Sequence, residues 1–227
     1  MTKIKEIIIG TNNEGKSKEI CDLLPKNLKK YFPKEFNILS PKETGKNFEE
    51  NSFIKASYFS KKTNLICLSD DSGLEVDLLK GRPGIYSSRW SGNMNNFDLA
   101  IRKVFEEMND IKKDWTNNNM ARFVCCMTLF WPDGKSYSST GIINGKISTE
   151  QKGTNGFGYD PIFIPSGYKQ TFSEMEPKLK MSIDHRFKAY NKNGFKGLHG
   201  EFFIKNNQSK HKLNIYKVSQ KKFVKVY

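Results

Sequence analysis

Residues 6–17, EIIIGTNNEGKS, decide the fold class of this chain. The apolar run over residues 6–10 predicts a buried strand, and the polar residues that follow it predict a turn. A helix is then expected over about residues 16–24. A buried strand that passes through a short turn into a helix is typical of an α/β protein.

The same alternation continues along the chain. Short strands are predicted over residues 36–39 and 65–68, and amphipathic helices over residues 48–62 and 95–108. Two longer strands, residues 123–130 and 137–147, flank the turn WPDG and are expected to pair. A glycine-rich loop follows over residues 153–158. We therefore predict an α/β protein with a mixed central sheet flanked by helices, built as one domain with an inserted lobe.

Composition excludes several classes of protein. The chain has 227 residues, of which 37% are hydrophobic and 13% aromatic, which indicates a folded globule. Its longest apolar run, residues 123–131, is far shorter than the ~20 residues of a membrane-spanning helix, and residues 1–9 do not resemble a signal peptide. The four cysteines form no C-x-x-C pair, so we expect reduced thiols in a cytoplasmic protein without a membrane partner.

The formal charge of +14 is unevenly placed, since 38 Lys and Arg stand against 24 Asp and Glu. Seven lysines and no acidic residue follow Glu201, so the tail holds half of the excess. We predict a basic C-terminal extension over residues 196–227, a β-hairpin packed on the domain, from the strand-like segments 213–218 and 223–227. Lysines interleaved with aromatic residues also fit a nucleic-acid-binding module. The hairpin with a solvated lysine face is favoured, so a nucleic-acid partner is not expected.

The first loop has two interpretations. Residues 10–17, GTNNEGKS, fit the Walker A pattern G-x-x-x-x-G-K-[ST] between a strand and a helix. Backbone amides at a helix N-terminus bind phosphate, and the lysine adds a positive charge. Alone, this pattern favours a P-loop ATPase or kinase.

A longer series of motifs favours another family. T-x-N-x-x-K at residues 11–16 is followed by FEENSFIKA at 48–56, DDSGLEV at 70–76, GRPGIYSSR at 81–89 and GFGYDPIF at 156–163. Lys180 and the pair His185-Arg186 complete the series. Over residues 4–190 this order resembles the inosine triphosphate pyrophosphatase family, which hydrolyses deaminated purine nucleoside triphosphates. Departures are Ser52 in place of Ala and Asp184 in place of Ser.

The resemblance implies a fold and a reaction. It implies an elongated, two-lobed single domain over residues 1–195, with the active-site cleft between the lobes, and a homodimer. The expected reaction converts ITP, dITP or XTP to the nucleoside monophosphate and pyrophosphate. The Walker match then becomes a coincidence of a different phosphate loop.

The resemblance also implies roles for particular residues. A water that attacks a phosphoryl group needs cations to neutralise the phosphate charge and a carboxylate to accept its proton. We expect Asp71 as the proton acceptor, with Lys16 and Lys55 beside the triphosphate. Magnesium prefers carboxylate oxygens, and Asp71 and Glu43 are its expected ligands, with Glu50 and Asp70 as weaker candidates. The expected substrate-binding residues are Thr11, Asn12, Asn13, Glu14, Gly15, Lys16, Ser72, Phe157, Gly158, Tyr159, Asp160, Lys180, His185 and Arg186.

Two further features shape these expectations. Asp70 and Asp71 are expected at the carboxyl end of the strand over residues 65–68, where α/β proteins place their ligands. The alternative for residues 70–73 is a turn without a functional role. Phe157 is expected to stack on the purine, and His185 with Arg186 to read its edge.

Overall fold

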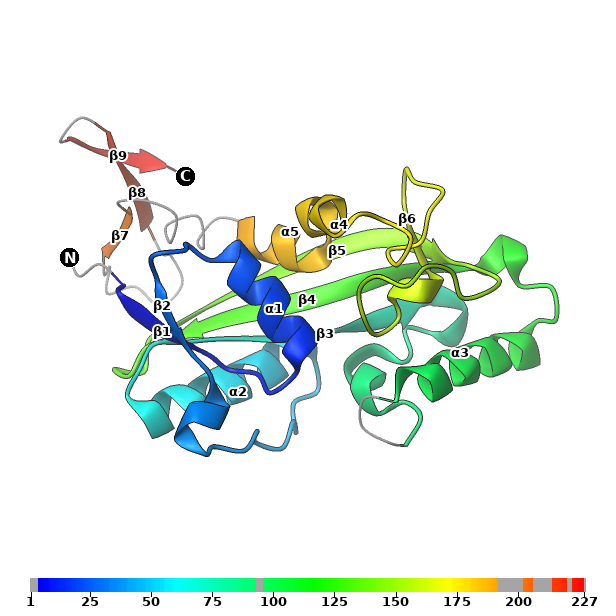
Figure 1. Ribbon diagram of the computed structural model, residues 1–227, viewed down its shortest axis with the longest axis horizontal. Helices are drawn as coiled ribbons and strands as arrows, with labels where there is room; N and C mark the ends of the chain where they lie inside the picture. Colours follow the sequence, from blue (N-terminus) through cyan, green and yellow to red (C-terminus); the bar gives the residue numbers. More distant parts are fainter. Residues whose placement is uncertain (1–3, 93–95, 192–201, 206–213, 220–221, 227) are drawn as a thin grey trace.

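A mixed six-stranded sheet organises the protein (Figure 1). The computed structural model describes residues 4–92 and 96–191, and the backbone of residues 202–205, 214–219 and 222–226. The strand order is β2-β1-β3-β4-β5-β6, in which β1 runs parallel to β2 and β3 and the other neighbours are antiparallel. The strands span Glu6–Ile9 (β1), Lys29–Tyr31 (β2), Cys67–Val76 (β3), Met120–Phe130 (β4), Ser136–Ile147 (β5) and Phe163–Pro165 (β6).

Five α-helices are formed by the described residues, and side-chain caps explain where the first two begin. Asn13 accepts a hydrogen bond from the amide of Lys16, and Asn47 accepts one from the amide of Glu50. The helices are α1 (Glu14–Leu23), α2 (Phe48–Thr63), α3 (Phe97–Ile111), α4 (Pro177–Ile183) and α5 (His185–Asn191), with 3-10 turns η1 (Pro33–Phe36), η2 (Asp77–Leu79), η3 (Gly84–Arg89), η4 (Thr116–Asn118) and η5 (Asp160–Ile162).

Helices cover both faces of the sheet around β1. Successive side chains of a strand point to opposite faces. Ile7 and Ile9 accordingly pack in one cluster with residues of α1 and α5, whereas Ile8 packs with Phe59 of α2. All three isoleucines are completely buried. This is why the opening segment reads as a continuous apolar run.

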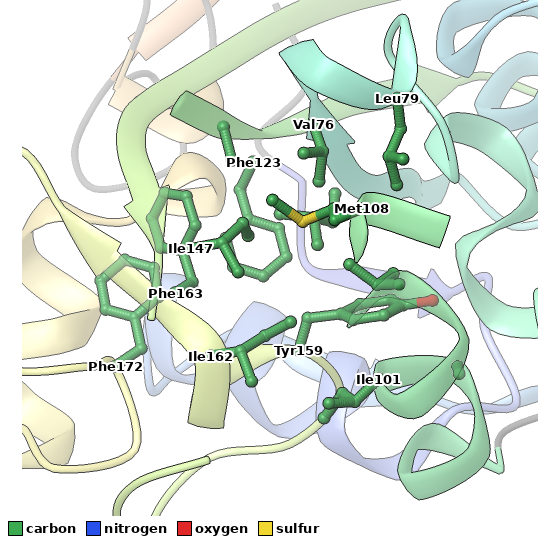
Figure 2. Close-up of a cluster of buried hydrophobic side chains, with 14 of the residues drawn as sticks. Val76, Leu79, Ile101, Met108, Phe123, Ile147, Tyr159, Ile162, Phe163 and Phe172 are labelled. Carbon is green, nitrogen blue, oxygen red and sulfur yellow. The ribbon is translucent and has the colours of Figure 1, made fainter. Parts of the chain in front are cut away.

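A second core lies at the other end of the long strands (Figure 2). Val76, Phe123 and Ile147 of β3, β4 and β5 pack there against Met108 of α3 and against Phe163. The clusters around β1 and this second core lie at different ends of one continuous sheet, and they divide the single domain into two lobes. The predicted fold class is therefore confirmed.

The predicted strand over residues 36–39 is wrong. Residues 33–36 form the turn η1, and Asn37 adopts a left-handed conformation with φ of 54° that ends it. The strand of this region is β2, which pairs with the edge of β1. Its sequence, Lys-Lys-Tyr, has no apolar alternation that could have revealed it.

The bounds predicted for the strand over residues 65–68 are also wrong, and the alternative of a turn at residues 70–73 is excluded, because β3 spans Cys67–Val76. Asp70 is paired with Met127 and Asp71 with Cys126 in an uninterrupted antiparallel ladder with β4. The parallel contact with β1 ends earlier, at Ile9 opposite Leu68. The two aspartates thus follow the carboxyl end of the parallel part of the sheet, but they lie inside a strand.

The C-terminal strands form a separate antiparallel sheet. β8 (Asn214–Ser219) pairs with β7 (Phe202–Lys205) on one side and β9 (Lys222–Val226) on the other. The predicted domain boundary between residues 195 and 196 lies outside the described residues and stays a prediction.

Two other features concern the cysteines and the membrane. All four cysteines are free thiols, as expected, and only Cys21 is not fully buried. Among the described residues, no helix is both long and apolar enough to cross a bilayer.

Candidate active site

A cleft of about 580 Å³, including the part open to solvent, is lined by residues of both lobes. Lys16 of α1 and Arg186 of α5 come from one lobe, and Phe97 of α3 comes from the other. The predicted site residues that line it are Asn13, Lys16, Glu43, Asp71, Ser72, Phe157, Gly158, Tyr159, Asp160, His185 and Arg186.

The alternation of β3 directs its two aspartates to different partners. Asp71 faces α2, where Asn51 Nδ2 donates to its Oδ2 over 3.1 Å. Asp70 Oδ2 lies 3.5 Å from Lys16 Nζ of α1 and 3.3 Å from Arg186 Nε of α5. One strand therefore gives its two carboxylates different hydrogen-bond and ion-pair partners.

Lys55 lies between two carboxylates on the α2 side. Its Nζ is 2.5 Å from Glu43 Oε1 and 3.4 Å from Asp71 Oδ1, and Arg89 Nη1 lies 3.1 Å from Glu43 Oε2. Burial raises the pKa of Asp71 against the opposing effects of Lys55 and Lys16. Burial acts in the same direction on Glu43, but there Lys55, Lys16 and Arg89 together outweigh it and the pKa is lowered. Asp71 is therefore the better proton acceptor of the two.

Asp70 is a fixed anion. It is completely buried, which by itself raises its pKa, but Lys16, Arg186 and Lys55 hold that pKa well below its ordinary value. Ser72 Oγ also donates to its Oδ2 over 3.0 Å. A carboxylate that stays ionised in this way orients the two cations beside it and does not exchange protons near neutral pH.

A buried charge network supports the other side of the cleft. Glu19 accepts hydrogen bonds from Lys180 Nζ over 2.7 Å and from Arg186 Nη1 over 2.6 Å. Lys180 also donates to Asp160 Oδ2 over 2.5 Å, and the same oxygen accepts the amide of Phe157. The network therefore ties the glycine-rich loop to α1, α4 and α5.

Phe157 connects this loop to the first one. Lys180 Nζ lies 5.2 Å from the centre of its ring, and the Arg186 guanidinium carbon lies 5.4 Å from it. A Cβ atom on Gly15 would lie 2.8 Å from the ring. Only glycine at position 15 thus lets the ring lie against the start of α1.

The contacts of His185 define its tautomer. Its ring stacks on Phe123 at 4.8 Å, and Arg186 Nη1 lies 3.2 Å from its Nε2. Burial and the nearby Arg186 and Lys180 lower its pKa far below the ordinary value, so the ring is neutral. Because a guanidinium only donates, Nε2 must accept and Nδ1 must hold the proton. Nδ1 is buried and has no partner among the described residues.

The first loop does not have the open form that the Walker interpretation requires. α1 already begins at Glu14, so only four residues separate it from β1. The amides of Thr11, Asn13 and Lys16 bond to Ile9 O, Thr11 Oγ1 and Asn13 Oδ1. Within the described part of the chain, the amides of Asn12, Glu14 and Gly15 have no acceptor. These three amides, not all six, are free to bind an anion at the N-terminus of α1.

Six predicted residues do not line the cleft: Thr11, Asn12, Glu14, Gly15, Lys55 and Lys180. Lys55 and Lys180 lie behind the carboxylates that do, and Asn12 Nδ2 donates to Ser40 Oγ. Glu50, a weaker metal candidate, bonds to the amide of Lys46 and the side chain of Asn47 instead.

Sequence reasoning missed three residues that hold the site together: Glu19, Asn51 and Arg89. Glu19 follows Lys16 by three positions, a helical spacing that would have placed both on one face of α1. Asn51 and Arg89 lie in the quoted motifs without an assigned role.

Glu43 and Asp71 are the carboxylates predicted from the sequence as metal ligands, and both line the cleft. No group of three or more His, Cys, Asp or Glu side chains in the described ranges is arranged as a metal site. The Lys55 ammonium, however, already occupies a cationic position between these two carboxylates. Magnesium is commonly held by one or two carboxylates, with water and substrate phosphates completing its shell. The residues present fit that mode of binding.

Comparison with known proteins agrees with the family resemblance of the sequence motifs. The dITP/XTP pyrophosphatase of Oceanobacillus iheyensis is 40% identical over 189 residues, covering 82% of this chain and 94% of that protein. The dITP/XTP pyrophosphatase of Zymomonas mobilis is 38% identical, with 81% and 88% covered. A solved HAM1 protein from Coxiella burnetii superposes with a TM-score of 0.72 at 35% identity, over 81% of this chain and 93% of that one.

The family model described as Ham1 matches residues 7–194 and leaves residues 195–227 outside the match. The resemblance stated from the sequence motifs is confirmed. This chain belongs to the Ham1 family.

Proposed function

We propose that the protein hydrolyses deaminated purine nucleoside triphosphates, ITP, dITP and XTP, to the nucleoside monophosphate and pyrophosphate. The relatives named dITP/XTP pyrophosphatase support this activity. The observation that carries it is the division of the cleft. A carboxylate of raised pKa lies with lysines at one end, and hydrogen-bond donors lie at the other.

At the phosphate end, which we define as Lys16, Lys55, Glu43 and Asp71, the Lys16 ammonium faces the triphosphate. Lys16, which lines the cleft, binds phosphate oxygens. Asp71 accepts the proton of the attacking water, a role for which its raised pKa suits it. Lys55 lies behind Asp71 and Glu43 and holds both in place.

We propose Mg²⁺ as the cofactor, held by Asp71 and Glu43. When bound, the ion neutralises charge on the phosphate oxygens and so favours attack by water. Lys55 keeps the two carboxylates within reach of the same cationic position.

At the base end, which we define as Glu19, Asp160, Lys180, His185 and Arg186, the pocket offers donors to the purine. Hypoxanthine and xanthine have an accepting oxygen at position 6, where adenine has a donating amino group. The His185 Nδ1 proton and the Arg186 guanidinium pair with that oxygen, and Phe157 stacks on the ring. Adenine would leave a buried donor unsatisfied, at about 1–3 kcal/mol for each mismatch.

We further propose that the catalytic unit is residues 1–195 and that it acts as a homodimer in the cytoplasm. The catalytic unit and the homodimer follow from the family resemblance. The cytoplasmic location follows from the four unbridged cysteines, which fit a reducing compartment.

The test is to compare kcat/KM for the triphosphates of inosine, xanthosine, adenosine and guanosine, with magnesium present. We expect the two deaminated substrates to exceed ATP by about 10²-fold or more, as for sites built around substrate hydrogen bonds. Equal values for ATP and ITP would contradict the proposed role of the base end.

A further inference from the structure

Asn51 joins two parts of the phosphate end that come from different elements. Its side chain is completely buried in α2. On one side, the amide of Gly45 donates to its Oδ1 over 2.8 Å, and Gly45 belongs to the loop that carries Glu43. On the other side, its Nδ2 donates to Asp71 Oδ2 over 3.1 Å. A backbone N–H can only donate, so it fixes the oxygen of the carboxamide toward Gly45 and the NH2 group toward the carboxylate.

The loop before α2 fits closely against Asn51. A Cβ atom on Gly45 would lie 2.7 Å from Asn51 Oδ1 and 2.9 Å from the backbone nitrogen of Asn51. Cβ atoms do not approach other atoms that closely, so glycine is required at position 45 for the loop to reach the carboxamide. The hydrogen bond and this close approach together place the loop against the first turn of α2.

Asn51 and Lys55 connect the same two carboxylates in different ways. Lys55 Nζ lies 2.5 Å from Glu43 Oε1 and 3.4 Å from Asp71 Oδ1, so its link between the loop and β3 is ionic. A cation that binds between the carboxylates competes with this ammonium for their oxygens, because both are positively charged. The carboxamide of Asn51 is neutral and bonds the other oxygen of Asp71, so its link does not compete with a cation.

We propose that Asn51 is a positioning residue that keeps Glu43 and Asp71 at a fixed spacing, independently of the Lys55 ammonium. Its role rests on the proposed function, in which the two carboxylates hold the metal ion. Asn51 does not line the cleft, so it acts through these carboxylates and not on the substrate. Partners that orient metal ligands in this way contribute about 10–100-fold to metal affinity or activity.

The test compares Asn51→Leu with Ser52→Ala. Leucine keeps the branched shape of asparagine, but it can neither accept from Gly45 nor donate to Asp71. Ser52 is the next residue of α2 and is also completely buried, and its Oγ lies 2.7 Å from Thr128 Oγ1. Both variants therefore remove buried hydrogen bonds from the same helix, but only Asn51→Leu removes a contact of a carboxylate.

The first measurement needs neither substrate nor metal. Hydrogen exchange of the full chain, resolved by NMR, follows the backbone amide of Gly45. We expect this amide to exchange on the order of tenfold faster in Asn51→Leu, because its acceptor is gone, and to keep its protection in Ser52→Ala. Equal protection in the two variants would show that Asn51 does not hold the loop, and it would overturn the proposal whatever the activity.

The second measurement is the affinity of the substrate-free protein for Mn²⁺, followed by electron paramagnetic resonance, with kcat and KM for inosine triphosphate measured beside it. We expect Asn51→Leu to lower Mn²⁺ affinity and kcat by about 10–100-fold and to leave KM near the parent value. Ser52→Ala should match the parent protein in all three.

Gly45→Ala is a second variant, which keeps Asn51 but forces the loop away from it. It should show the same losses, and it decides the question if Asn51→Leu does not fold. The proposal is overturned if the folded variants bind Mn²⁺ and turn over substrate as Ser52→Ala does. A parent protein that hydrolyses no inosine triphosphate would instead contradict the proposed function, and the exchange of the Gly45 amide would still decide whether Asn51 holds the loop.

Discussion

Lys16, which lines the cleft, and Lys180, which lies behind Asp160, differ in how far their charges are already satisfied. Among the described residues, Lys16 has one ion pair, 3.5 Å from Asp70, and its side chain is 15% exposed. Lys180 has two, at 2.5 Å and 2.7 Å, and its side chain is 6% exposed. Lys16 can bind a phosphate without breaking a short ion pair, whereas moving Lys180 would break two short ion pairs.

This difference distinguishes a lysine that can bind substrate, Lys16, from one that supports the structure of the site, Lys180. Lysine motifs look alike in a sequence, and both residues were expected to touch substrate. We now propose that Lys180 is a positioning residue, because it holds Asp160, and Asp160 in turn holds the amide of Phe157. At the phosphate end, the Lys16 ammonium can exchange its partner for a substrate phosphate. At the base end, the ion pairs of Lys180 stay in place.

The largest expected effect is the loss of turnover in Asp71→Asn. The variant keeps the shape of the side chain but removes the proton acceptor and one metal ligand. General-base catalysis contributes about 10²–10⁴-fold, so kcat should fall by at least the lower value. Glu50→Gln is the matched control, because it neutralises a carboxylate near the start of α2 that bonds outside the cleft. Normal turnover in Asp71→Asn, with an intact fold, would show that Asp71 has no part in the chemistry.

The next effect compares the two lysines directly in Lys180→Met and Lys16→Met. Removing Lys180 leaves Asp160 and Glu19 buried with one cation fewer, and breaking a buried pair costs about 3–5 kcal/mol of unfolding free energy. Removing Lys16 should cost less, since Asp70 retains Arg186 and Ser72. Denaturant unfolding measures both. If Lys16→Met destabilises the protein as much as Lys180→Met, the distinction between the two ends fails.

A smaller effect concerns Asp184, which caps α5 by accepting the amide of Phe187. Burial and the charge of Glu19 raise its pKa to about 7 from 3.8, against Arg186 and Lys180. Between these values the folded protein keeps a proton that the unfolded chain releases. Stability from this group is therefore present at low pH and is lost as the pH rises toward 7.

Asp184→Asn retains a capping oxygen and removes that titration. The variant should be more stable than the parent protein at pH 8, and the difference should shrink toward pH 4. Thermal melts of both proteins across this range measure it. A difference that is the same at every pH would mean that Asp184 titrates normally.

Some parts of the molecule could be predicted from sequence because their signals are local. The helical spacing of α2 and the turn between β4 and β5 are examples. The polar half of β3 was not predicted as strand, since Asp, Ser and Gly favour turns until a long antiparallel partner overrides them. Glu19 was missed because its partners lie more than 160 positions away.

In the candidate site, too, residues with local sequence signals could be predicted, and features that depend on long-range contacts could not. Lys16, Asp71 and Arg186 could be placed in it because they belong to contiguous motifs, and all three line the cleft. The tautomer of His185 could not be predicted, since it depends on a guanidinium contact that only the folded chain creates.

The central claim is that Asp71 and the phosphate end direct water to release pyrophosphate. Its most direct test is to identify the first products of a single turnover of inosine triphosphate with magnesium. We expect inosine monophosphate and pyrophosphate in equal amounts, with no diphosphate at any time. Inosine diphosphate and orthophosphate as the first products would contradict it and would return the first loop to its Walker interpretation.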